Sequence, residues 1–266
     1  MTYCCGILVQ AGLVMVADTR TNAGLDNIST FRKLHVYTQP GERIMAIASS
    51  GNLSLSQSVR STLTEGVQNP ETGEVETLMN APTMFQAAQR IGRTIRNLQV
   101  AEGTALAAAE VDHEVAFLFG GQIKGGRLQL FMIYSAGNFI ECTIDTPYLQ
   151  IGEHKYGKPV LDRAIAFDTD LYDALKIGLI SMDSTMRSNL GVGLPIDILV
   201  VRRDAAPRRS TTASSRASPT SRTCANAGHR RCAQRTSQFR GRHIGVQTER
   251  FGRSLNHRIN LRFPIN

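Results

Sequence analysis

The sequence predicts an α+β protein built as a four-layer αββα sandwich, in which two antiparallel sheets face each other and helices cover both outer faces. The first observation is the order of the patterns, which runs strands, two helices, strands, two helices and a last strand. Such blocks favour an α+β fold over alternating βαβ units. Tight-turn residues between the short apolar runs are typical of antiparallel hairpins. The 266 residues are enough for a substantial buried core.

Four apolar runs of strand length occupy the first fifty residues and predict two hairpins. The first turn contains Ala11-Gly12, and the second spans residues 39–42, where Pro40-Gly41 combines a preset φ with a residue that accepts positive φ. The predicted strands are residues 3–10, 13–17, 33–38 and 43–49.

The period then changes from that of a strand to that of a helix. Leu55, Val59, Leu63 and Val67 recur every four residues and predict one amphipathic helix. Apolar residues between 84 and 98 predict a second helix, entered through Pro82-Thr83. The polar residues 69–80 between them predict a flexible connection.

The second half of the domain repeats the order of the first. Predicted turns at Gly120-Gly121, Gly125-Gly126 and Gly137-Asn138 follow or separate the strand patterns. The predicted strands are residues 115–119, 128–135 and 139–143, the predicted helices are 159–167 and 171–188, and a last strand covers 195–201.

Composition divides the chain into a domain at residues 1–203 and a tail at 204–266. The net charge is +8, yet residues 202–266 hold 15 arginines against two acids, so the first 201 residues carry −5. The tail is rich in Arg, Ser, Thr, Ala and Pro, without periodicity, and this composition cannot bury enough apolar surface to fold. We expect it to be disordered or an out-of-frame reading of the gene.

Several classes of protein are disfavoured by what the sequence lacks. No apolar run approaches the roughly 18 residues of a membrane span, and the start lacks the features of a secretory signal, so we expect a cytoplasmic protein without membrane contact. The five cysteines form no CxxC pair, which disfavours disulfides. No metal or cofactor is expected, because the histidines lack ligand spacing and Cys224, His229 and Cys232 are irregularly spaced.

Thr2, directly behind the initiator methionine, is the candidate nucleophile. Removal of Met1 would leave a residue with a hydroxyl group and a free α-amine, which is partly neutral near pH 7 and can act as its base. Asp18 ends the second predicted strand and Lys33 begins the third, so we expect both to meet Thr2 at one sheet edge. The lysine charge would then assist proton transfer, and the carboxylate would hold the lysine in place.

Ser50-Gly51 is the candidate oxyanion site, because it lies where a strand joins a helix N-terminus. A glycine-containing turn presents backbone N–H donors without obstruction by side chains. Ordinary structural roles also fit these residues, since Asp18 can cap a turn, Lys33 can be a solvated residue at a strand edge, and Gly51 can simply begin a helix.

These motifs resemble the β-type subunits of proteasomes, which are N-terminal-nucleophile hydrolases. The resemblance covers residues 2–203 and rests on Thr2, residues 17–20, Lys33, residues 50–52, residues 181–184, residues 191–193 and Asp197. The segment 151–159 and the apparent lack of a propeptide resemble most closely the bacterial Anbu, or ancestral β-subunit, family.

The resemblance implies a role for each matched residue. Thr2 would be the nucleophile, Asp18 and Lys33 its activating pair, Gly51 the oxyanion donor, and Asp183 the residue that orients the terminal amine. Thr21 and Ser50 would line the channel where a peptide substrate pairs as an added strand. In one departure from the proteasome pattern, Glu153 replaces a serine beside the terminal amine, where a carboxylate would hold that amine protonated.

The leading functional interpretation is a threonine-type peptidase that acts on peptides or unfolded proteins inside a homo-oligomer, either a ring or a spiral. The alternative is an amidase with the same nucleophile and a small molecule or peptide conjugate as substrate. A noncatalytic subunit is disfavoured because Thr2, Asp18 and Lys33 are all present. Fifteen tail arginines also predict nonspecific binding to nucleic acid, although the tail has no recognisable reading motif.

Overall fold

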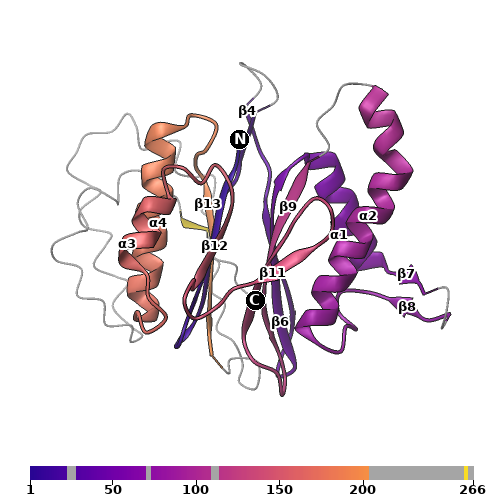
Figure 1. Ribbon diagram of the computed structural model, residues 1–266, viewed down its shortest axis with the longest axis horizontal. Coiled ribbons are helices and arrows are strands. Elements are labelled where there is room, and N and C mark those ends of the chain that lie inside the picture. Colours follow the sequence, from indigo (N-terminus) through magenta and orange to yellow (C-terminus); the bar gives the residue numbers. More distant parts are fainter. Residues whose placement is uncertain (23–27, 70–72, 109–113, 204–260, 263–266) are drawn as a thin grey trace, which may run out of the picture.

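The protein folds as four layers, with two β-sheets in the middle and a helix pair on each outer face (Figure 1). The computed structural model describes residues 1–22, 28–69, 73–108, 114–203 and 261–262. The predicted α+β sandwich of two antiparallel sheets is confirmed. The N-terminus lies at one end of the two central sheets, near β4 (Figure 1).

The first sheet has the strand order β12-β1-β2-β13-β14. Its strands pair antiparallel except at the β13–β14 edge, where two residues of the tail add a short parallel strand. Cys4 pairs with both Ala17 and Ile151, so β1 lies centrally between β2 and β12. The strands are β1 (Tyr3–Val9), β2 (Gly12–Asp18), β12 (Tyr148–Gly152), β13 (Ile196–Arg202) and β14 (Leu261–Arg262).

The second sheet has the order β11-β10-β9-β6-β5 and is antiparallel throughout. Its strands are β5 (Leu34–Gln39), β6 (Arg43–Gly51), β9 (Val115–Ile123), β10 (Gln129–Ile133) and β11 (Phe139–Glu141). Two small hairpins lie outside both sheets, namely β3 (Arg20–Asn22) with β4 (Ile28–Thr30), and β7 (Val67–Gln68) with β8 (Val75–Glu76).

Helices α1 (Leu53–Glu65) and α2 (Met84–Ala108) cover the second sheet, and α3 (Lys158–Ala164) and α4 (Leu171–Ser188) cover the first (Figure 1). The side chain of Asn52 caps α1 by accepting from the Leu55 amide, and that of Asp170 caps α4. Both residue types are preferred N-caps because they satisfy amides that have no partner within the helix.

Three apolar clusters follow from this layering. One lies between the two sheets and includes Leu13, Leu118 and Leu130. The other two lie between each sheet and its helices, around Phe117 and Ile91 on one side and around Ile7 and Met182 on the other. Both faces of each sheet are therefore buried, which explains why β1 and β2 read as continuous apolar runs.

The structure corrects several local predictions. Gly120-Gly121 is not a turn but lies within β9, which continues to Ile123. A side chain at position 120 would crowd Leu13 between the sheets, its Cβ lying 2.8 Å from a Leu13 methyl, so glycine there reflects close packing. The helix predicted to extend through Val67 ends at Glu65, because Gly66 takes a φ of 98° and Val67 joins β7.

Some elements were not predicted at all. Strand β12 was missed because its five residues have no clear alternation. Of the β7–β8 hairpin, β8 lies in the segment 69–80 predicted to be a flexible connection, and β7 lies directly before that segment. The β3–β4 hairpin was also missed. Apart from β14, the predicted tail lies outside the described residues. Among the described helices, none is long and apolar enough to cross a membrane.

The position of Gly120 gives a direct test of the packing between the sheets. Gly120→Ala should lower the free energy of unfolding by about 1–3 kcal/mol, the usual cost of adding atoms to a filled core. Gly126→Ala, in the β9–β10 turn, is the matched control and should change stability by less than about 0.5 kcal/mol. Urea denaturation measures both, and equal effects would contradict the packing described for Gly120.

Candidate functional site

A buried ion pair between Asp18 and Lys33 forms the centre of the candidate site. Lys33 Nζ lies 2.8 Å from Asp18 Oδ1, and the two residues are 5% and 0% exposed. Asp18 is the last residue of β2, and Lys33 immediately precedes β5 in the other sheet. The predicted contact between the two residues is therefore present, but it joins the two sheets and does not lie at the edge of a single one.

Asp18 also accepts hydrogen bonds from two backbone amides. The Tyr3 amide donates to Oδ1 at 3.0 Å, and the Gly193 amide approaches Oδ2 at 3.4 Å. Lys33 in turn donates to the Arg20 carbonyl oxygen at 2.6 Å. Burial raises the pKa of Asp18, while Lys33 and the two amides oppose this rise by stabilising the carboxylate.

Thr2 is half-buried and lies immediately before β1, next to the amide that Tyr3 donates to Asp18. Its carbonyl oxygen accepts from the Glu153 amide at 2.7 Å. Gly152 packs against the same carbonyl with a φ of 81°, and a Cβ at this position would overlap the carbonyl oxygen. Met1 is 70% exposed, with its side chain beside Gly191. The backbone of Thr2 is thus fixed while the preceding residue stays accessible.

Glu153 lies in the same region as Thr2. Its Oε2 accepts from the Asn189 side chain at 3.1 Å, and Asn189 also accepts from the Gly191 amide at 2.9 Å. Asn189 therefore fixes the Glu153 side chain relative to the loop that contacts Met1. The Glu153 carboxylate is therefore fixed near the N-terminal segment, and its predicted influence on the terminal amine stays a prediction.

Ser50 and Gly51 end β6, directly before the N-cap of α1. Gly51 has a φ of 93° and packs so closely on the Glu114 carbonyl that a side chain would overlap it. The positive φ and the close approach both require glycine at this strand-to-helix join. The predicted position of Gly51 at the join of a strand and a helix is therefore confirmed, but the predicted turn is wrong, because Ser50 and Gly51 still belong to β6 and pair with β9. The role of Gly51 as an oxyanion donor stays a prediction.

Two further predicted residues lie in less constrained positions. Thr21 is half-buried in β3 and pairs with Ser29 of β4. Asp183, on α4, forms an exposed ion pair with Arg187 in which Oδ2 and Nε are 2.7 Å apart. The predicted role of Asp183 in orienting the terminal amine stays a prediction, and in this structure one of its oxygens is engaged by Arg187.

Tyr3 is a structural residue of the site that the sequence reasoning missed. Its side chain is fully buried, and its hydroxyl lies 2.6 Å from Ser181 Oγ and accepts from the Gln150 side chain. Ser181 is also 2.9 Å from the Gly157 carbonyl oxygen, to which it donates. This network anchors the residue next to Thr2 to α4. A tyrosine at the start of an apolar strand was the available signal, since buried tyrosine hydroxyls usually find partners.

The remaining titratable groups near the site have structural roles. Cys4 and Cys5 are buried on opposite faces of β1, and burial raises the pKa of Cys5 to about 12 and also raises that of Cys4. Both thiols are therefore protonated at neutral pH and pack as small apolar groups. In the described part of the chain, no group of three or more His, Cys, Asp or Glu side chains is placed to hold a metal ion.

Removal of Lys33 tests the buried pair. Lys33→Ala leaves Asp18 buried without its counter-charge and should lower the free energy of unfolding by about 3–5 kcal/mol at pH 7. Without Lys33, the folded-state pKa of Asp18 rises further, so the folded state favours the protonated acid. The difference in unfolding free energy between the wild type and Lys33→Ala should then become smaller as the pH falls toward about 4.

Denaturant titrations of both proteins between pH 4 and pH 8 measure this effect. Asp18→Asn combined with Lys33→Ala is the control, because it removes both charges and its deficit should depend less on pH. A deficit for Lys33→Ala that stays constant over the whole range would contradict a buried charge at Asp18.

The contact between Gly152 and Thr2 can be separated from backbone strain. Gly152 and Gly125 both have a φ of 81°, but a Cβ at Gly125 would meet nothing within 4 Å. Gly152→Ala should therefore cost clearly more stability than Gly125→Ala, which carries only the strain of about 1 kcal/mol. Thermal unfolding of the two variants measures the difference, and equal losses would exclude the predicted clash with the Thr2 carbonyl.

Comparisons with known proteins identify the family. No protein-family model and no curated sequence matched the chain. Among solved structures, Anbu (ancestral β-subunit) from Yersinia bercovieri is 48% identical over 77% of this chain and 83% of its own, with a TM-score of 0.70.

Two other similar structures agree. The Anbu (Gly-1) mutant from Hyphomicrobium sp. strain MC1 is 47% identical with a TM-score of 0.69, and the Anbu complex of Pseudomonas aeruginosa, solved as a helical assembly, is 45% identical with a TM-score of 0.70. Each match covers 77% of this chain and 83% of the other. On these identities and the shared fold, the chain belongs to the Anbu family of proteasome-type β-subunits.

Proposed function

We propose that this protein is a threonine-type peptidase, in which removal of Met1 exposes Thr2 as the nucleophile. The observation that carries the proposal is the buried Asp18–Lys33 pair, whose carboxylate is hydrogen-bonded to the Tyr3 amide directly beside Thr2. A fixed ammonium group next to a hydroxyl nucleophile favours its deprotonation. Membership of the proteasome-type β-subunits supports an N-terminal-nucleophile hydrolase in general.

The proposed reaction has two steps that balance in atoms and charge. The Thr2 hydroxyl oxygen attacks the substrate carbonyl carbon, and its proton passes through the α-amine to the leaving amine as the C–N bond breaks. Water then attacks the resulting ester, releasing a carboxylic acid and restoring the hydroxyl. The Gly51 amide is proposed to stabilise the oxyanion in both steps, because the end of β6 and the start of α1 leave it unobstructed by a side chain.

The substrate is proposed to be a peptide or unfolded protein segment that pairs along Thr21 and Ser50 as an added strand. We further propose that the protein works as a homo-oligomer. This rests on its similarity to the P. aeruginosa relative, which was solved as a helical assembly. Identical head-to-tail contacts produce a ring or a spiral according to one rotation angle, so both forms are compatible with the proposal.

Glu153 favours a second candidate function, an amidase with a small molecule or peptide conjugate as substrate. Its amide binds the Thr2 carbonyl and its carboxylate is held by Asn189. A carboxylate near the terminal amine favours the ammonium form, which is a poor base, so hydrolysis would depend more on activated or specially placed amides.

The decisive experiment is the intact mass of the purified protein before and after incubation with a peptide epoxyketone, with the adduct mapped by digestion. This electrophile requires a hydroxyl group and a free amine on one residue. We expect loss of Met1 and a single adduct on Thr2, which Thr2→Ala abolishes. Retention of Met1, or an adduct on any other residue, would overturn the proposed mechanism.

A peptidase and an amidase then differ in turnover. Lys33→Ala should abolish labelling in either case, whereas Glu153→Ser should accelerate peptide hydrolysis if Glu153 holds the amine protonated. An unchanged rate in Glu153→Ser would remove the argument for the amidase.

A further inference from the structure

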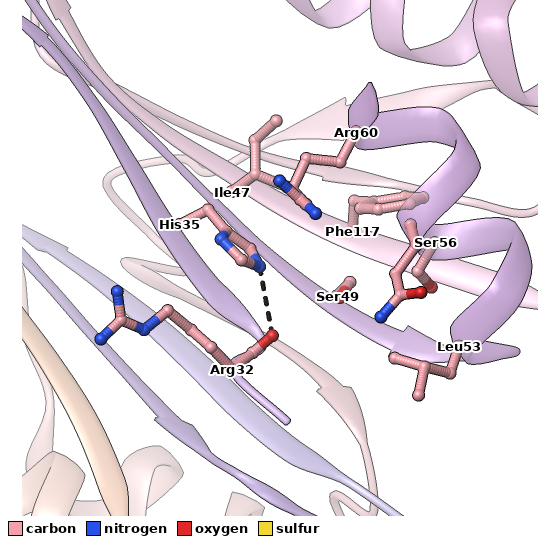
Figure 2. Close-up of a pocket in the computed structure, with 9 residues that line it drawn as sticks. Arg32, His35, Ile47, Ser49, Leu53, Ser56, Arg60 and Phe117 are labelled. Carbon is pink, nitrogen blue, oxygen red and sulfur yellow. Dashed lines mark hydrogen bonds between the residues drawn. The ribbon is translucent and has the colours of Figure 1, made fainter. Parts of the chain in front are cut away.

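A small hollow lies between α1 and the second sheet, beside the candidate active site (Figure 2). Two of its lining residues are sequence neighbours of site residues. Arg32 precedes Lys33, and Ser49 precedes Ser50-Gly51, while the Ser49 amide also donates to the Lys33 carbonyl at 3.2 Å. A side chain that enters this hollow would therefore belong to a substrate whose backbone passes the end of β6.

The lining combines an apolar floor with a basic rim. Ile47 and Phe117 form its buried apolar part, and Ser49 and Ser56 add hydroxyl groups to the lining. Arg60 comes from α1, and Figure 2 shows its side chain beside His35. Arg32 is on the strand side, with a side chain that is 57% exposed.

The charge of the lining has one sign. None of the lining residues is acidic, and the carboxylate nearest to Arg32 is that of Asp197 at 3.8 Å, on β13 of the first sheet. His35 Nε2 donates a hydrogen bond to the Arg32 carbonyl oxygen at 3.1 Å. Burial and the neighbouring Arg60 lower the pKa of His35 to about 4, so it is neutral at pH 7. Among the residues that line the hollow, Arg60 therefore supplies a guanidinium group with no opposing carboxylate, while the Arg32 guanidinium points away from the other lining side chains, toward Asp197 of the first sheet (Figure 2).

The hollow has a volume of about 10 Å³, enough for about one water molecule. A substrate side chain therefore requires a lining side chain to move, and Arg60 is suited to this because it is long and only half-buried on α1. An apolar substrate side chain offers the displaced Arg60 guanidinium group no new hydrogen-bond partner. A carboxylate forms a charge-assisted and often bidentate pair with it.

We propose that this hollow selects peptide substrates with an acidic side chain, aspartate or glutamate, on the carbonyl side of the cleaved bond. The inference rests on the proposed peptidase function and specifies its substrate class. The methylene groups of the acid pack on Ile47 and Phe117, and its carboxylate binds Arg60. A basic substrate side chain is repelled by the like charge of Arg60. A large apolar side chain covers the Arg60 guanidinium group without replacing its hydrogen bonds to water.

Three peptide epoxyketones that differ only in the residue next to the electrophile test the selectivity. That residue is glutamate, leucine or lysine, and the rate of adduct formation on Thr2 is followed by intact mass at pH 7.5. We expect the glutamate probe to react about tenfold faster or more, which corresponds to the lower range for hydrogen bonds to charged groups. Arg60→Glu should reverse the order so that the lysine probe reacts fastest.

Arg60→Gln keeps a hydrogen-bonding side chain without charge, so it should reduce the glutamate preference without reversing it. Arg127→Glu is the matched charge control and should preserve the wild-type ratios. Arg127 is exposed and pairs with Glu141 of β11, which lies at the opposite edge of the second sheet from β5. Wild-type labelling that is fastest with leucine, or equal for all three probes, would overturn the selectivity while leaving the nucleophile established. Labelling by none of the probes would overturn the proposed function and this inference together.

Discussion

The buried carboxylate of Asp18 is the interaction on which the arrangement of the site depends. It receives Lys33 from the start of β5, the Tyr3 amide from the start of β1 and the Gly193 amide from the loop before β13. A carboxylate without exposure is tolerated only when charge and hydrogen bonds replace its water. The charge and hydrogen bonds that stabilise this one carboxylate therefore fix three segments that are far apart in the sequence. One of these segments begins at Tyr3, the residue that follows Thr2.

The fold and the site differed in how far the sequence could predict them. Helix α4 was predicted with its observed bounds because its apolar period is long. The Asp18–Lys33 contact was predicted from the positions of both residues at strand ends, although the two strands belong to different sheets and not to one edge. Strand β12 and the Tyr3–Ser181 contact depend on partners about 150 or more residues away, and local period carries no information about such partners.

Two glycines show that the position of Gly51 at a strand-to-helix join was predicted correctly, whereas the turn predicted at Gly120 was wrong. Gly51 and Gly120 both belong to the second sheet, and a turn was predicted near each. Gly51 has positive φ at a strand end, which is a local backbone property that sequence context reveals. Gly120 is required by Leu13 of the opposite sheet, and this contact exists only after the two sheets have packed.

Strands β5 and β6 connect the buried ion pair of the candidate site with the hollow that is proposed to select the substrate. Lys33, at the start of β5, faces Asp18, whereas His35 and Ser49 line the hollow under α1. The hydrogen bond between the Ser49 amide and the Lys33 carbonyl connects these two regions. Under the proposed selectivity, a charge placed in the hollow would alter substrate preference without contact with the Asp18–Lys33 pair. Because the pair is buried, whereas Arg60 is half-buried and the Arg32 side chain is 57% exposed, substitutions at these two arginines carry less cost in stability than substitutions in the pair.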